Sequence, residues 1–191
     1  MWNKIISLIL VFLAIITAME ICYAARDQSP KAVEKWVKYL KYPSSEKLTK
    51  LHFFCHHLRG ATAVTIARAA ATAASPTYFG LMDVRDDPLT VGPDESSQRV
   101  GYAQGISAAA SLEEISSYDL FTYVFTSREF NGSTLAVLGS CPLFAPSCEA
   151  AVVGGSGVFR LARGWVTARI YYLNFNAGKA SLEVNVVALH Y

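Results

Sequence analysis

Residues 158–173 read VFRLARGWVTARIYYL, a run rich in aromatic and β-branched side chains. Such residues favour β-strands, in which successive side chains point to opposite faces of the sheet. The odd-numbered residues, among them Leu161, Arg163 and Trp165, would share one face, and the even-numbered ones, such as Val166, the other. The stretch predicts a long strand with an arginine between apolar neighbours.

The rest of the chain after residue 47 has the same texture. Short runs of β-branched and aromatic residues alternate with turn-forming segments such as RGAT, DDPLTVGPDE and VGGSG. They predict strands over 48–59, 62–72, 77–84, 97–109, 118–127, 133–138, 149–153, 158–175 and 180–190. The chain has 191 residues, 52% of them hydrophobic, which is enough for one packed domain. Many closely spaced strands predict an antiparallel sandwich or barrel.

The predicted strand 97–109 has one face with almost no side-chain volume. Gly101, Ala103, Gly105 and Ser107 share this face. Such a face either lets a neighbouring element approach closely or leaves room for a cavity. In a barrel interior, a cavity would be room for a ligand.

The first 24 residues have the layout of a secretory signal peptide. Lys4 precedes an apolar or hydroxylic run from Ile5 to Met19, and small residues follow at Cys22 and Ala24. A transmembrane anchor is the alternative, but it needs about 20 apolar residues, more than this run supplies. We expect cleavage after Ala24, secretion, and no membrane association afterwards.

Residues 25–46 form a polar lead-in before the barrel domain at 47–191. Ser29 and Pro30 resemble an N-cap followed by a proline in the first helical turn, and apolar residues then recur at helical spacing. A short basic helix and a mobile arm both fit this pattern. With a formal net charge of +2 and no dense basic patch, the chain gives no reason to expect a nucleic-acid partner.

Three cysteines remain after cleavage, which allows one internal disulfide and one free thiol. Cys141 and Cys148 could close the loop CPLFAPSC, although spacing alone does not show it. Cys55 lies in a predicted strand and is expected to be a small buried residue. Asn131 begins the N-x-Ser pattern NGS, which in an exported chain predicts glycosylation.

The segment LHFFCHHLRG, residues 51–60, poses the question of a metal site. On a helix, His52 and His56 would share a face, but on a strand they lie about 13 Å apart. His56 and His57 point to opposite faces of a strand. The strand interpretation therefore predicts no metal site here and no cofactor.

Four motifs resemble the plant dirigent protein family. They are FGLMDVRDDPLTVGPDESSQRVGYAQG at 79–105, VFTSREFNGSTLAVLG at 124–139, VVGGSGVFRLARGW at 152–165 and NVVALHY at 185–191. The resemblance implies an all-β fold, an eight-stranded antiparallel β-barrel related to the allene oxide cyclase and lipocalin-like barrels. It also implies an apoplastic, glycosylated homo-oligomer, a trimer or else a dimer, without a redox centre.

The resemblance implies a role in phenylpropanoid chemistry. Family members take phenoxy radicals made by a separate laccase or peroxidase and direct their coupling, for example of the monolignol coniferyl alcohol in lignan or lignin-related metabolism. Others act as cyclases on quinone methides. We expect this chain to guide radical coupling rather than to oxidise. The alternatives are a non-catalytic phenolic-binding or wall-patterning barrel, and a quinone-methide cyclase or dehydratase.

The resemblance also suggests site residues. Arg163 matches a barrel-lining arginine that could hold a phenolate, and His57 stands where relatives usually place an acid and could donate a proton. Around this catalytic pair we place the substrate pocket, with Asp86 and Asp87 at the rim or in a turn. The predicted pocket residues are Phe53, Asp86, Asp87, Ser107, Leu161 and Trp165.

The chain departs from the usual motifs at several positions. His57 replaces an aspartate in the first strand, Tyr102 replaces the arginine of GRAQG, and Ser107 replaces an aromatic residue. Val158 stands where pinoresinol-forming members tend to carry an acid. These departures argue against pinoresinol-type coupling specifically and leave the expected fold unchanged.

Overall fold

The computed structural model describes residues 29–41 and 46–191. The candidate signal peptide, residues 1–24, lies outside the described residues. The chain divides into two compact units, 1–44 and 45–191. The first contains helix α2 (Pro30–Lys41). Of the two alternatives for the lead-in, a short helix or a mobile arm, the helix is therefore the one observed. Within the described ranges, no helix is long and apolar enough to cross a membrane.

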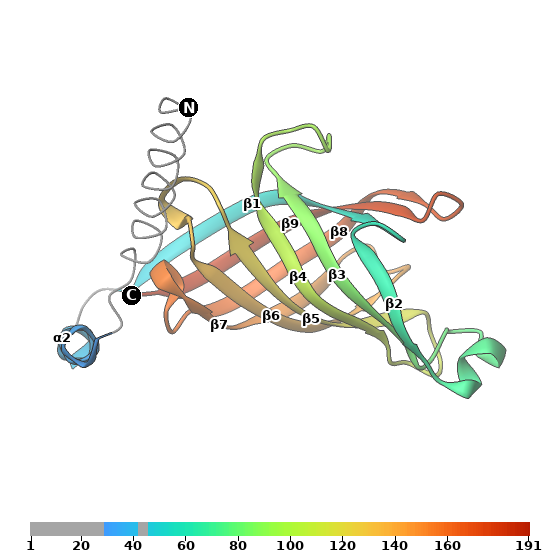
Figure 1. Ribbon diagram of the computed structural model, residues 1–191, viewed down its shortest axis with the longest axis horizontal. Coiled ribbons are helices and arrows are strands. Elements are labelled where there is room, and N and C mark those ends of the chain that lie inside the picture. Colours follow the sequence, from blue (N-terminus) through green and yellow to red (C-terminus); the bar gives the residue numbers. More distant parts are fainter. Residues whose placement is uncertain (1–28, 42–45) are drawn as a thin grey trace, which may run out of the picture. The chain divides into compact units, whose positions relative to one another are not determined.

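The second unit consists of nine antiparallel strands (Figure 1). Their bounds are β1 Lys47–Leu58, β2 Ala63–Arg68, β3 Leu81–Thr90, β4 Arg99–Ala109, β5 Ser116–Phe125, β6 Thr134–Pro142, β7 Cys148–Ser156, β8 Arg163–Asn174 and β9 Lys179–His190. Each strand from β2 to β9 pairs with its sequence neighbour, which is the pairing that short turns favour.

The sheet closes on itself through its first strand. β1 pairs with β9 along its whole length, from Lys47 opposite His190 to Leu58 opposite Lys179. Its other edge meets β3 at Phe54–Thr90 and Cys55–Leu89. This closure confirms the predicted eight-stranded antiparallel barrel, formed by β1 and β3–β9. β2 is a ninth strand that pairs with the part of β3 that β1 leaves uncovered.

The sequence predicts the third strand over 77–84, too early in the chain, because DDPLT resembles a turn. In the structure β3 runs through Pro88 to Thr90. The amide of Asp86 donates to the carbonyl of Thr62, so the nitrogen of Pro88, two residues on, faces the same edge. That edge has a gap between the last β2 pair at Arg85 and the first β1 pair at Leu89. Proline is tolerated at this position because no neighbouring strand offers a carbonyl that needs a backbone N–H donor, which proline lacks.

Two other predicted strands were too long. The strand predicted over 62–72 ends at Arg68, and the short helix η1 (Ala70–Ala74) follows it. The strand predicted over 158–175 begins only at Arg163, because Gly157–Phe159 form the short helix η3.

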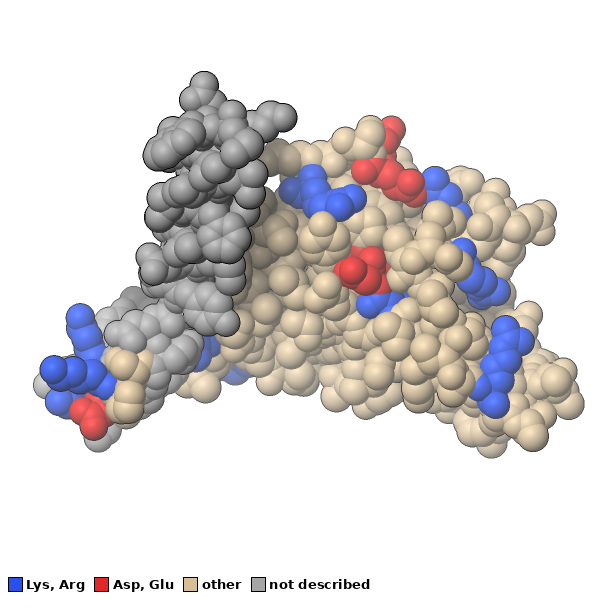
Figure 2. All heavy atoms as spheres, in the orientation of Figure 1, with Lys and Arg blue, Asp and Glu red and all other residues tan. Residues whose placement is uncertain are grey.

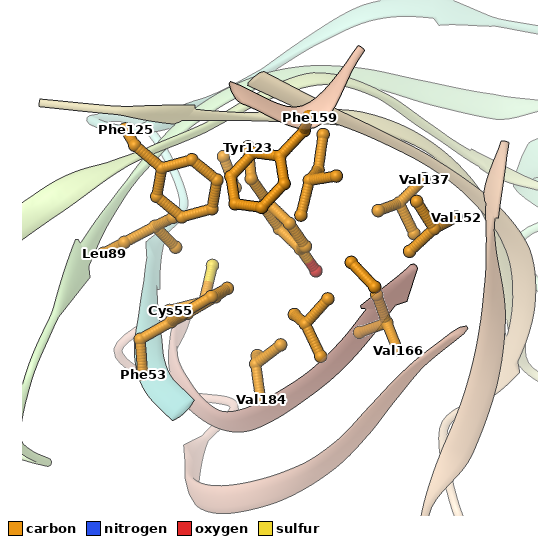
Figure 3. Close-up of a cluster of buried hydrophobic side chains, with 14 of the residues drawn as sticks. Phe53, Cys55, Leu89, Tyr123, Phe125, Val137, Val152, Phe159, Val166 and Val184 are labelled. Atoms are coloured by element: carbon orange, nitrogen blue, oxygen red, sulfur yellow. The ribbon is translucent and has the colours of Figure 1, made fainter. Parts of the chain in front are cut away.

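The barrel core is densest around a group of aromatic rings (Figure 3). Phe53 of β1 meets Tyr123 and Phe125 of β5 edge-on, with ring centroids 5.1 and 6.3 Å apart. Phe159 of η3 packs 5.6 Å from Phe125 and closes this end. Such aromatic pairs add stability beyond the area they bury.

The small residues on the inner face of β4 are explained by its neighbour. A Cβ added at Gly101 would lie 2.2 Å from the carbonyl oxygen of Val124, and one at Gly105 would lie 2.0 Å from that of Leu120. The sequence left two explanations for this face, the close approach of a neighbouring element or room for a cavity. At both glycines it is the backbone of β5 that approaches closely.

Candidate functional site

The barrel interior is sealed at one end and reached by solvent at the other. Along the inner face of β3, Leu89 is fully buried and Asp87 is 1% exposed, whereas the Arg85 side chain is 13% exposed and Asp83 is half-buried. Side chains of one face should be equally buried in a barrel closed at both ends. The gradient therefore shows that the end of the barrel at Asp83 is the one more exposed to solvent.

Two more strands show the same gradient in the same direction. On β5, Phe125 and Tyr123 are buried, while Phe121 and Asp119 are only partly buried. On β1, the exposure rises from the buried Cys55 to the side chain of His57, which is 18% exposed. The open end of the barrel is thus lined by ionisable residues.

Asp87 holds the polar groups at this end together. Its Oδ1 accepts a hydrogen bond from Thr62 Oγ1 at 2.5 Å, and its Oδ2 accepts from Arg85 Nε at 2.8 Å. Arg85 Nη2 lies 2.6 Å from the same oxygen. His57 Nδ1 approaches Oδ2 to 3.4 Å, without the geometry of a hydrogen bond. The carboxylate is therefore fixed in place by two neighbours and attracts a third.

These contacts determine the charge of Asp87. Burial alone would raise the pKa of this carboxyl, but His57, Arg85 and Thr62 more than offset it, and the pKa lies below its usual value. The guanidinium of Arg85 also lies 4.9 Å from the centre of the Phe121 ring, which adds a cation–π contact. Asp87 and Arg85 are both charged and bound to each other.

A second row of polar residues runs across three neighbouring strands on the inner face, closer to the open end of the barrel. Asp83 on β3, Ser107 on β4 and Asp119 on β5 are direct cross-strand neighbours. Ser107 Oγ donates to one carboxylate oxygen of Asp119 at 2.5 Å, and Ser117 donates to the other at 2.9 Å. Asp83 Oδ1 is buried but makes no hydrogen bond in the part of the chain described. Asp83 therefore has a free acceptor inside the barrel.

Two buried residues, Tyr123 and Cys55, lie deeper in the barrel than these two rows of polar residues. The hydroxyl of Tyr123 projects into the middle of the barrel (Figure 3). Burial, and then the negative charges nearby, hold the pKa of this phenol far above its usual value, so it stays a neutral donor. Burial likewise raises the pKa of the Cys55 thiol to about 12.

The loops at the open end carry exposed apolar side chains. Cys141 and Cys148, at the end of β6 and the start of β7, form a disulfide with Cα atoms 5.2 Å apart. The loop that it closes presents Phe144, which is 76% exposed. Large exposed side chains also lie in the neighbouring loops at Tyr78, Leu112 and Phe175. This apolar rim could contact the parts of a ligand that protrude from the barrel.

The structure places four predicted site residues inside the barrel. His57 and Asp87 face each other, Ser107 binds Asp119, and Phe53 is 2% exposed in the core. The pair predicted as catalytic, His57 and Arg163, is not brought together, because the two lie on opposite sides of the wall.

Four predicted site residues, the catalytic candidate Arg163 and three pocket candidates, lie outside the barrel interior, so they do not line the pocket as predicted. Arg163 binds Glu46 on the outer surface, with Nη2 3.0 Å from Oε2. Leu161 and Trp165 are 55% and 45% exposed. Val166, which is 2% exposed, shows that the even-numbered face of β8 is the inner one. Asp86 is exposed and accepts a hydrogen bond from Gln104 on the outer face of β4.

Four residues of the site were not predicted from the sequence: Asp83, Arg85, Asp119 and Tyr123. The first two could have been found, because Asp83, Arg85 and Asp87 alternate along DVRDDPLT and must share a face in a strand. The same spacing relates Asp119 to Tyr123. Because a turn was predicted at DDPLT, these residues were not assigned to a strand, and the alternating pattern was not recognised.

The side chains at the open end can orient a bound ligand and exchange protons with it. It combines an imidazole, carboxylates, a fixed guanidinium and a neutral phenol next to aromatic walls. Such groups can orient a hydroxylated aromatic ring and assist proton transfer to or from it. Among residues 29–41 and 46–191, no three His, Cys, Asp or Glu side chains are grouped to hold a metal ion.

Comparison with known proteins shows what this barrel is similar to. The sequence model of the Dirigent-like protein family matches residues 48–189. Dirigent protein 1 of Arabidopsis thaliana is 44% identical over 149 residues, covering 76% of this chain and 80% of its own. Pterocarpan synthase 1 of Glycine max is 43% identical over 150 residues, covering 76% and 81%.

Solved structures show the same relationship. The pterocarpan synthase dirigent protein GePTS1 is 40% identical, with a TM-score of 0.71, over 78% of this chain and 89% of its own. A second one, PsPTS1, is 36% identical with the same TM-score and is covered over 99% of its length. The match spans the whole barrel, including the strands that carry the polar rows. The chain belongs to the dirigent protein family.

Proposed function

We propose that this protein controls the stereochemistry of bond formation in a phenolic quinone methide, or its alcohol precursor, at the open end of the barrel. The observation that carries this proposal is the set of proton-exchanging side chains on the inner wall, with His57 3.4 Å from Asp87. Orientation alone needs only a shaped apolar pocket, whereas ring closure also requires protons to move.

The proposed reaction needs no oxidant. An alcohol precursor first becomes the quinone methide by losing water: its phenol gives up a proton, the benzylic carbon–oxygen bond breaks, and the hydroxyl group leaves with a proton. A phenol hydroxyl of the substrate attacks the exocyclic carbon of the quinone methide and loses its proton, while the carbonyl oxygen gains one and the ring becomes aromatic. Asp119 and Asp83 supply carboxylate acceptors for the first proton, and protonated His57 supplies the second. Asp87 Oδ2 lies 3.4 Å from Nδ1 of this histidine. The shape of the inner barrel wall determines which face of the carbon the hydroxyl attacks.

The relatives support ring closure as the leading candidate. Proteins named pterocarpan synthase are 43% and 40% identical to this chain, and two solved structures that are 40% and 36% identical to it bear the same name. A second candidate is stereoselective coupling of monolignol radicals supplied by a separate laccase or peroxidase. The aromatic walls formed by Phe121 and Tyr123 favour it, because stacked rings can hold two phenols in one orientation.

One pair of assays separates these functions. The purified protein is incubated with a racemic hydroxylated precursor of a quinone methide without oxidant, and separately with coniferyl alcohol and a one-electron oxidant. Products are resolved on a chiral column. Ring closure predicts oxidant-independent turnover that His57→Gln lowers at least tenfold. Radical coupling predicts an enantiomeric excess only with oxidant. Racemic products in both assays would leave only a phenolic-binding or wall-patterning barrel.

We propose that the protein acts outside the cell, in the apoplast. The Cys141–Cys148 disulfide supports this, because disulfides persist in oxidising compartments. Asn131 is exposed in the turn before β6, as an acceptor for glycosylation must be. Expression in a plant secretory system, with removal of the glycan by an endoglycosidase, tests both points. A single intracellular, unglycosylated species would contradict them.

We also propose that the barrel forms a homo-oligomer, a trimer or a dimer, through its outer wall. A cross-strand row of aliphatic residues on that wall is between 37% and 54% exposed: Val64, Val84, Ile106 and Leu120. Figure 2 shows that most of the barrel surface in view carries uncharged side chains, with Lys, Arg, Asp and Glu side chains scattered among them. Large exposed apolar patches mark association surfaces. Leu120→Lys should produce monomers in light scattering, and an unchanged mass would exclude this face.

A further inference from the structure

The barrel closes at a short contact between β1 and β3, which we call the seam. β1 pairs with β9 along its whole length. With β3, in contrast, only Phe54 and Cys55 of β1 are in register among the residues that the structure describes. So short a ladder supplies few backbone hydrogen bonds, and side chains must therefore contribute much of what holds the seam closed.

His56 connects the two strands on either side of β1. Thr90 Oγ1 of β3 donates to the carbonyl of Gly92 in the β3–β4 loop, residues 91–98, at 2.7 Å. At the imidazole the same hydroxyl therefore accepts, from Nε2–H at 2.7 Å. In the neutral ring Nδ1 then carries no proton and accepts from the hydroxyl of Ser181 on β9, at 3.0 Å. Protonation at Nδ1 turns this acceptor into a donor, so Ser181 must give up the bond that it donates.

Protonating His56 in the closed seam would also bury a positive charge. The residue is 2% exposed, and burial is the largest influence on the imidazole, so its pKa lies below the usual value. Three carboxylates act against burial: Glu95 and Asp94 in the loop, and Asp87 on β3. Lys179, at the start of β9, acts in the same direction as burial. The closed seam thus favours the neutral ring, and the charged ring favours contact with water.

The β3–β4 loop lies across the outside of β1 at the same place. Cys55 and His57 face the interior, so His56 between them faces the outer side of the wall. Glu95 Oε1 in the loop lies 2.9 Å from Nζ of Lys179, and both side chains are exposed. Because β1 lies between β3 and β9, this ion pair spans β1 on the outer side. An exposed ion pair contributes little by itself, so the position of the loop depends on the bonds of His56.

From these observations we propose that His56 is a pH-sensitive latch, whose protonation releases the β3–β4 loop and opens the seam while the rest of the barrel stays folded. The latch is closed above about pH 6.5, the usual value for histidine, and opens as the pH falls through the lower, folded-state pKa. Opening exposes the interior beside Cys55 and His57. The latch acts on the barrel wall and does not depend on the reaction proposed for the interior.

The thiol of Cys55 reports on the seam, because it is buried inside the barrel opposite Leu89. Dithiodipyridine stays reactive toward thiols in mild acid, since protonation of its ring activates the leaving group. Cys55 forms a mixed disulfide with one thiopyridine, and the other is released in reduced form and measured by its absorbance. In mature protein cleaved after Ala24, the rate relative to that of glutathione at the same pH should rise about tenfold from pH 7 to pH 5. The circular dichroism spectrum should not change.

Variants identify the histidine responsible. His56→Gln keeps a donor and an acceptor but does not titrate, and it should abolish the rise in rate. His52→Gln is the matched control, because His52 lies on the same outer face of β1 but is exposed and bonded to Glu183. It should keep the rise. His57→Gln should also keep it, since His57 faces the interior.

Hydrogen exchange tests the latch in the unaltered protein, whether or not His56→Gln folds. The amide of Val91 donates to the carbonyl of Gln98, and that of Ser97 donates to the carbonyl of Asp94. After correction for the intrinsic exchange rate, both amides should lose protection between pH 7 and pH 5, while the amides of β5 and β6 keep theirs.

Three results would overturn the latch. They are a relative thiol rate that does not change with pH, a rise that persists in His56→Gln, and a rise accompanied by loss of the circular dichroism signal, which would mean that the whole barrel unfolds. Uniform protection of the loop amides at both pH values would overturn it as well. None of these measurements involves turnover, so the latch and the proposed function can fail separately.

Discussion

Arg85 and Asp87, two residues apart on β3, form an ion pair inside the barrel, with Nη2 2.6 Å and Nε 2.8 Å from the same carboxylate oxygen. Because the pair is internal, the arginine stabilises the wall instead of binding anionic ligands. Asp87 also binds Thr62, so the pair connects β3 to the turn between β1 and β2. The seam where the barrel closes thus depends on this carboxylate.

Asp87→Ala should therefore destabilise the protein strongly. The substitution leaves the guanidinium of Arg85 in a mostly buried site without its counter-charge, which typically costs about 3–5 kcal/mol. Urea unfolding followed by circular dichroism measures the free energy of unfolding. Asp86→Ala, one position away on the outer face, should change it by no more than about 0.5 kcal/mol. Equal effects of the two variants would contradict the assigned faces.

Stability should fall as the pH drops below about 6.5, the usual pKa of histidine. His56 is 2% exposed and bonded to Thr90 and Ser181, and its burial lowers the pKa of the imidazole. The folded state therefore favours the neutral ring. The stabilisation is complete above the unfolded-state pKa and is lost as the pH falls through the lower, folded-state value. His56→Gln should remove this part of the pH dependence, and identical pH profiles would contradict it.

The fold was predictable from the sequence, but the inner and outer faces were less so. Alternation around Arg163 separates two faces of β8 without showing which is inside, since both carry apolar residues. The size of Trp165 favours the prediction that this residue faces the interior. The interior beside β9 is already occupied by Val184 and Val186, so it accepts Val166 and leaves Trp165 outside.

The candidate site was predictable only in part, for a related reason. His57 and Asp87 were found through the resemblance, and the structure brings them within 3.4 Å. Arg85 was missed because its strand was predicted to end before it. Strand pairing, which a single sequence does not contain, places Asp83, Ser107 and Asp119 in one row.

The thiol of Cys55 should be unreactive in the folded protein. It is buried, and burial followed by the charge of Asp87 raises its pKa to about 12, so almost no thiolate forms at pH 8. Ellman's reagent should detect no thiol in native protein and one thiol per chain after unfolding in urea, in mature protein cleaved after Ala24. Rapid reaction of the native protein would show that the barrel floor is open to solvent.

Removing the Cys141–Cys148 disulfide should lower stability moderately. The bridge spans a sequence separation of seven, and closing so short a loop contributes about 2 kcal/mol in the chain-entropy account. The double variant Cys141→Ser, Cys148→Ser should unfold at lower urea concentration. A reducing agent should destabilise the unaltered protein by a similar amount and leave the variant unaffected. An effect of the reductant on the variant would point to another cause.

Arg163→Ala should leave ligand binding and product stereochemistry unchanged. Its side chain is 59% exposed and pairs with Glu46 on the outer surface, where exposed ion pairs contribute little and no bound ligand is within reach. Arg85→Leu, by contrast, leaves Asp87 without its main partner and should impair both folding stability and ligand binding. Calorimetric titration with coniferyl alcohol and chiral product analysis, made on both variants, compare the two arginines. Loss of selectivity in Arg163→Ala alone would show that this arginine reaches the ligand from the outer surface of the barrel.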